Sequence, residues 1–110
     1  MGADFYLLPE DGEWKGWGAR AAAGLPDWRK TYAISAWVGE NCPQWDPNDW
    51  HDMDSLVTGA DLERLLAEAQ KPGGGELGSD EAERVIEQLP LLFARPEYAR
   101  TNRYRFVRSY

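Results

Sequence analysis

The chain has 110 residues, of which 43% are hydrophobic and 13% aromatic, and its net charge is −7 at pH 7. This length and composition predict a single α+β domain over residues 1–110 rather than a disordered or fibrous chain. The lone cysteine, Cys42, excludes an internal disulfide framework and favours a reducing compartment. With no apolar run long enough for a signal peptide or a membrane span, we expect a soluble cytoplasmic protein.

The first third of the chain predicts mostly extended structure. Residues 4–8 are aromatic and aliphatic and favour an opening strand. Residues 14–18 favour a short strand weakened by its glycines, and the alanine-rich residues 19–24 are too few for a helix without tertiary support. Residues 31–38 give the strongest strand prediction, because β-branched and aromatic residues are frequent and the side chains alternate. Both faces of that strand carry apolar groups, so we expect it at the centre of a sheet.

The middle of the chain predicts a loop, a brief strand and a helix. Residues 39–54 lack periodicity and contain turn-forming residues, and residues 55–57 favour a short strand. A helix is expected from about Gly59, with Thr58 as its N-cap, because apolar residues then recur at i, i+3, i+4 and i+7. It should end at Lys71 and Pro72, and residues 73–75, all glycine, predict a flexible linker.

The last third predicts a second helix and a closing strand. The helix should begin at a cap formed by Ser79 or Asp80 and should end or kink at Pro90. Residues 103–110 alternate aromatic and basic side chains, which predicts a strand with a basic outer face. The expected fold is therefore α+β, with a small antiparallel sheet and two amphipathic helices packed on one of its faces.

Acidic and aromatic residues are concentrated in one segment. Residues 31–63 contain seven acids, three of the six tryptophans and no lysine or arginine. Tryptophan supplies large contact area at protein interfaces, and carboxylates steer association with a basic surface. This composition predicts a surface that binds a basic protein partner, formed by Glu40, Trp45, Asp46, Asp49, Trp50, Asp52 and Asp54. The other interpretation is that the tryptophans pack inward while the aspartates only keep a long loop soluble.

A second charged face is basic. It comprises Arg100, Arg103, Arg105 and Arg108, in a C-terminal segment that holds five arginines against one acid. These side chains are expected to fold back onto the acidic body, or to dock on the acids of a neighbouring subunit. Direct nucleic-acid binding is disfavoured, because residues 1–94 carry 18 acids and seven bases and would repel phosphates.

Motifs for other chemistry are weak. One cysteine and one histidine cannot supply the four ligands of a structural zinc site, and Leu56 and Val57 interrupt the only segment that resembles a calcium loop. Cys42 with His51 as its base would be the only candidate for thiol catalysis, and no recognised signature surrounds them. We therefore predict no catalytic residues, no metal and no cofactor.

These observations lead to a hypothesis of a non-enzymatic antagonist that binds and blocks a basic, nucleic-acid-handling protein. In size and charge the chain is similar to immunity proteins that neutralise toxins and to anti-CRISPR proteins that mimic DNA with carboxylates. The alternatives are a small enzyme that uses Cys42 and His51, and a subunit of a larger complex that docks through its arginine-rich C-terminal strand.

Overall fold

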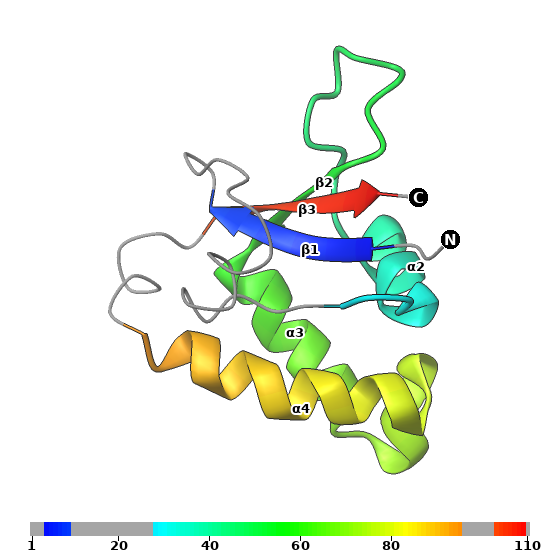
Figure 1. The fold of residues 1–110 in the computed structure, drawn as a ribbon, viewed down its shortest axis with the longest axis vertical. Helices are drawn as coiled ribbons and strands as arrows, with labels where there is room; N and C mark the ends of the chain where they lie inside the picture. The colour runs from blue at the N-terminus through cyan, green and yellow to red at the C-terminus, as the bar shows by residue number, and fades with distance from the viewer. Residues whose placement is uncertain (1–3, 10–27, 96–102, 110) are drawn as a thin grey trace.

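The computed structural model describes residues 4–9, 28–95 and 103–109, and its centre is a three-stranded antiparallel sheet (Figure 1). The strands are β1 (Asp4–Pro9), β2 (Ser55–Thr58) and β3 (Arg103–Ser109), in the order β1-β3-β2. The last strand in the sequence is thus the central one. The expected elements at residues 14–18 and 19–24 lie outside the described residues.

The three strand predictions at residues 4–8, 55–57 and 103–110 are confirmed by β1, β2 and β3, with residue 110 outside the described residues. Leu7 pairs with Phe106, and Val57 pairs with Tyr104. Directly opposite residues share a face, so these four buried side chains all point into the core.

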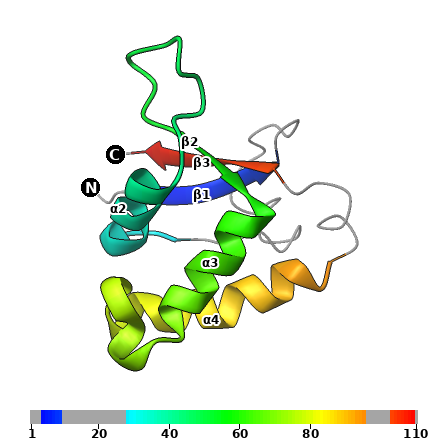
Figure 2. The same ribbon diagram turned by 180° about the vertical axis from the view of Figure 1, so that it is seen from behind.

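The helices are α2 (Tyr32–Asn41), α3 (Gly59–Ala69) and α4 (Ser79–Phe93), with the short helical segment η1 (Pro72–Leu77) between the last two. Figures 1 and 2 show α3 and α4 on one side of the sheet, and α2 beside the end where β1 begins and β3 finishes. This arrangement confirms the α+β class with helices on one face.

Residues 31–38 form most of helix α2, so the prediction of a central strand there was wrong. Apolar residues fall on both faces of the expected strand, and they also supply a helical face through Ile34, Trp37 and Val38. A short run that is apolar in both registers cannot be assigned by periodicity alone. The central position in the sheet belongs to β3 instead.

The predicted cap of α3 is confirmed. The side chain of Thr58 accepts a hydrogen bond from the Asp61 N–H, and the Asp61 carboxylate accepts one from the Thr58 N–H at 2.9 Å. The predicted cap of α4 was wrong, because Gly78 is the N-cap and Ser79 and Asp80 lie within the first turn. Gly78 has a φ of 77°, which a glycine adopts without strain.

The expectations about the end of the second helix and about the glycine linker also require correction. Of the two outcomes expected at Pro90, an end or a kink of the helix, the end is contradicted because α4 continues to Phe93. The three glycines 73–75 form part of η1, where each has a positive φ and Gly74 is buried, so this segment is an ordered turn and not a flexible linker.

One hydrophobic core joins all the strands and helices. Its largest fully buried side chains are Trp28, Phe5, Phe106, Leu7, Ile34, Leu62, Leu65 and Leu89. Trp28 lies just before α2, and its backbone N–H donates to the carbonyl of Phe5 at 3.1 Å, which ties this turn to the outer edge of β1.

Candidate functional site

The segment that connects α2 to β2, residues 43–54, projects beyond the sheet and is called the acidic loop below (Figure 1). The two legs of the loop, the segment that leaves α2 and the segment that enters β2, are held together by backbone hydrogen bonds. Trp45 donates to the carbonyl of Asp54 at 2.9 Å, and Leu56 donates to the carbonyl of Pro43 at 2.9 Å. A β-bridge between Gln44 and Ser55 completes this ladder, so the base of the loop extends the sheet at β2.

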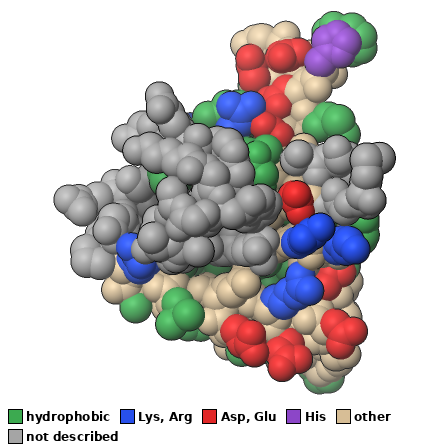
Figure 3. All heavy atoms as spheres, viewed as in Figure 1, with side chains coloured by type: hydrophobic (Ala, Val, Ile, Leu, Met, Phe, Trp, Pro, Cys, Tyr) green, Lys and Arg blue, Asp and Glu red, His purple; other side chains and the backbone are tan. Residues whose placement is uncertain are grey.

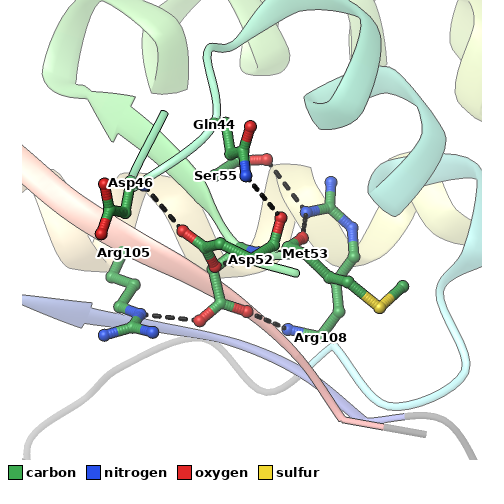
Figure 4. Close-up of polar contacts among 8 residues, drawn as sticks. Gln44, Asp46, Asp52, Met53, Ser55, Arg105 and Arg108 are labelled. Atoms are coloured by element: carbon green, nitrogen blue, oxygen red, sulfur yellow. Dashed lines mark hydrogen bonds and ion pairs between the residues drawn. The ribbon is translucent and has the colours of Figure 1, made fainter. Parts of the chain in front are cut away.

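Asp52 organises the interior of the acidic loop (Figure 4). Its carboxylate accepts hydrogen bonds from the N–H of Asp46 at 2.7 Å and from the N–H of Asp54 at 2.9 Å. The side-chain amide of Gln44 donates to the carbonyl oxygens of Asp52 and Asp49. The bonds that involve Gln44 and Asp46 cross from one leg to the other, whereas the bond from Asp54 is local, and together they hold the loop in shape without any partner.

The carboxylates of Asp46 and Asp49 lie on the exposed side of the loop. Asp46 accepts a hydrogen bond from the N–H of Asn48, and Asp49 accepts one from the N–H of His51, each at 2.9 Å. Such local turns are the usual reason for aspartate in tight loops. Each carboxylate still has oxygen lone pairs that face solvent, since it accepts this one local bond and is exposed.

Two arginines of β3, on opposite faces of the strand, contact the base of the acidic loop and hold it against the sheet. The Nε of Arg105 donates to Asp54 at 2.7 Å, and its guanidinium lies 5.4 Å from the centre of the Trp45 ring. Arg108 donates to the carbonyl of Met53 at 2.6 Å and to the hydroxyl of Ser55 at 2.9 Å (Figure 4). Contact with acids of the same chain was one of the two outcomes expected for these arginines, and the pair of Arg105 with Asp54 is such a contact.

The tip of the acidic loop points away from the body of the protein. The side chain of Trp50 is 83% exposed, and its ring lies 3.5 Å from that of His51, centre to centre. Figure 3 shows this histidine, in purple, at one end of the molecule, beside a hydrophobic side chain and near a group of acidic side chains. Met53 is also exposed, at 61%.

The predicted partner-binding residues therefore separate into two groups. Asp46, Asp49 and Trp50 are exposed on the loop, and Glu40 is exposed on α2. Asp52, Asp54 and Trp45 are half-buried and contact groups of their own chain. The loop predicted at residues 39–54 was wrong over residues 39–41, which belong to α2. The sequence also did not distinguish the residues that support the loop from those that face solvent.

A groove of about 440 Å³ runs between α2 and the base of the acidic loop. No sequence pattern indicated it, because its walls come from segments far apart in the chain. Its lining is mainly small and polar, and comprises Ser35, Ala36, Gly39, Cys42, Gln44, Asp52, Met53, Asp54, Ser55 and Arg108.

Cys42 and His51 differ in their surroundings. Cys42 is buried at the edge of the groove, and this burial, together with the nearby charge of Asp61, raises the pKa of its thiol to about 12. The thiol is therefore protonated at neutral pH, whereas a catalytic cysteine needs a thiolate. His51 lies against Trp50 at the exposed tip of the loop, with the two rings tilted by 35°.

The other candidate residues give no further site. Within the described residues no group of three or more histidine, cysteine or acidic side chains is placed to hold a metal ion. Arg103 is exposed on β3, and Arg100 lies outside the described residues. Of the helices that the structure describes, none has the length and apolar character required to cross a bilayer.

Comparison of the chain with models of protein families, with curated proteins and with solved structures finds no match. Its function is therefore argued from the geometry of the acidic loop.

Proposed function

We propose that this protein is a small acidic binding protein that docks the tip of its acidic loop on a basic, nucleic-acid-handling partner and blocks that partner. The observation that carries the proposal is Trp50, a side chain 83% exposed at the end of a loop that its own hydrogen bonds hold in shape. The exposed carboxylates of Asp46 and Asp49 lie on the same loop.

Three properties of this arrangement favour binding: the contact area of the tryptophan, the negative charge beside it and the fixed shape of the loop. A tryptophan buried in a partner's pocket is among the most frequent hot-spot residues of protein interfaces. Carboxylates beside it steer association with lysine and arginine and set the register. Because the loop is ordered before binding, little conformational entropy is lost when it docks.

Two biological settings require these properties. One is an immunity protein that neutralises a nuclease toxin, and the other is a phage protein of the anti-CRISPR type that places carboxylates where DNA phosphates would lie. In both, the protein acts by occupying a basic surface and needs no catalytic group.

The proposal is tested by capture of partners from host lysate on the immobilised protein, with washes of rising salt. We expect a basic nucleic-acid-binding protein to be retained at low salt and released at high salt, and to be displaced by its own nucleic acid. The double variant Asp46→Lys with Asp49→Lys should no longer capture this partner, and neither should the separate variant Trp50→Ala.

The matched control is Glu83→Lys with Glu87→Lys, which changes the net charge equally on the exposed side of α4. It should capture the same partner as the unmodified chain. Equal capture by the loop variants and the α4 variant would contradict the proposal.

A further inference from the structure

One side chain of β3, that of Arg108, bridges two elements that are not adjacent in the sequence. Its Nε donates to the hydroxyl of Ser35 at 2.8 Å, and its Nη2 donates to the carbonyl of Ser35 at 3.0 Å. Its Nη1 donates to the carbonyl of Met53 and to the hydroxyl of Ser55. The same guanidinium therefore contacts the middle of α2 and the base of the acidic loop.

The geometry of these contacts suits arginine in particular. The planar guanidinium presents its donors in a fixed fork, so one half can serve the helix while the other half serves the loop. Ser35 and Ser55 are buried, with 7% and 4% of their surface exposed. A buried hydroxyl that loses its hydrogen-bond partner is costly, so a movement of either element away from Arg108 is opposed.

Arg105 provides a natural comparison. It also extends from β3 to the acidic loop, where it pairs with Asp54 and lies over Trp45, but its described contacts include none with α2. Arg105 fastens the loop to the sheet alone, whereas Arg108 also connects the loop to a helix.

We propose that Arg108 is a positioning residue that couples the acidic loop to α2, so that the two elements open and close as one cooperative unit. Proteins open locally in such units, whose members lose their hydrogen bonds together. The loop tip is then held in a fixed direction by α2 as well as by the sheet. Only this consequence for binding rests on the proposed function; the coupling itself is a property of the free protein.

The test is amide hydrogen exchange of the free protein, compared among Ser35→Ala, Ser55→Ala and the unmodified chain. Ser35→Ala removes a contact of Arg108 on the helix side, and Ser55→Ala removes one on the loop side. If the two elements are coupled, a substitution on one side of Arg108 should change amide exchange in the element on the other side. Ser35→Ala should speed exchange of the Trp45 and Leu56 amides about fivefold or more, and Ser55→Ala should do the same for the Cys42 amide at the end of α2.

Amides in the α3–α4 pair should keep their rates in both variants, which separates coupling from a general loss of stability. The Arg105→Gln variant weakens the acidic loop while Arg108 stays in place, so a single cooperative unit predicts faster exchange in α2 as well as in the loop. In an Arg108→Gln background, Ser35→Ala should have no further effect on the loop.

The proposal is overturned if each serine variant changes exchange only in its own element, or if all slow amides accelerate equally. Neither result depends on a partner. If the exchange data show coupling but the unmodified chain captures no basic partner, the result counts against the proposed function alone. If the chain captures such a partner but the exchange data show no coupling, the result counts against this inference alone.

Discussion

Glu81 and Ile34 are 47 positions apart, yet the carboxylate of Glu81 accepts a hydrogen bond from the backbone N–H of Ile34 at 2.9 Å. The other oxygen of the same carboxylate accepts from the N–H of Ala33 at 3.2 Å. Helix α2 has no side-chain cap of its own, because the hydroxyl of Thr31 donates to the carbonyl of Trp28 instead. A side chain of α4 thus supplies the negative charge and the acceptors that the N-terminus of α2 requires.

We predict that Glu81→Ala lowers the free energy of unfolding by about 1–2 kcal/mol, the usual cost of a lost N-cap. Urea denaturation followed by circular dichroism measures this change. Glu83→Ala, at an exposed position of the same helix, is the control and should change stability by less than about 0.5 kcal/mol. Equal effects of the two substitutions would show that the contact with α2 contributes nothing.

The same contact explains why the sequence predicted the wrong element at residues 31–38. The local pattern there favours a strand, and neither an acid in the first turn nor a base in the last turn indicates a helix. The groups that stabilise the helix, Glu81 and Arg108, are supplied by α4 and β3. For α3 the segment carried its own signal in Thr58, and the prediction of this N-cap succeeded.

The capping box of α3 should make stability depend on pH. Burial acts to raise the pKa of Asp61, but hydrogen bonds from Thr58 and Arg64 outweigh it, so the pKa lies below its ordinary value. A depressed pKa in the folded state means that the ionised carboxylate stabilises the protein above the ordinary value of about 3.9. This contribution is lost as the pH falls through the folded-state pKa.

We therefore predict that Asp61→Asn costs about 1 kcal/mol of unfolding free energy at pH 7 and less at pH 3, because the contribution of the carboxylate declines once the pH falls below the ordinary aspartate pKa of about 3.9. Urea denaturation at both pH values gives the two differences. Glu63→Gln, an exposed position in the same helix, should have little effect at either pH. A cost that stays constant from pH 7 to pH 3 would contradict this explanation.

The ordered turn at residues 73–75 predicts that replacing Gly73 and replacing Gly75 lower the free energy of unfolding by different amounts. A Cβ at Gly75 would lie 2.8 Å from the backbone oxygen of Glu68, at a φ of 59° that other residues rarely adopt. A Cβ at Gly73 would meet nothing within 4 Å and would face only the strain of its φ of 66°. We expect Gly75→Ala to lower the unfolding free energy by about 2–3 kcal/mol, and Gly73→Ala to lower it by about 1 kcal/mol.

Thermal or urea denaturation of the two variants tests this ranking. Equal and small costs would mean that the turn adapts freely, as a flexible linker would.

For the candidate site, composition located the loop but not the orientation of its side chains. Asp46 and Asp52 are chemically identical, yet Asp46 is exposed, whereas Asp52 is half-buried and accepts a backbone hydrogen bond from across the loop. Their roles depend on how the chain turns between them. The groove beside the loop could not be predicted for a similar reason, since α2, the acidic loop, β2 and β3 form it together.

The raised pKa of Cys42 predicts a slowly reacting thiol. Burial and the charge of Asp61 raise this pKa to about 12, so at pH 8 the thiolate population is far smaller than for a free cysteine with a pKa of about 8.5. We expect the rate of reaction with a disulfide reagent at pH 8 to be at least about tenfold lower in the folded protein than in urea. Cys42→Ser supplies the blank. A folded protein that reacts as fast as the unfolded chain would show an activated thiol, and the small-enzyme alternative with His51 would then become the stronger one.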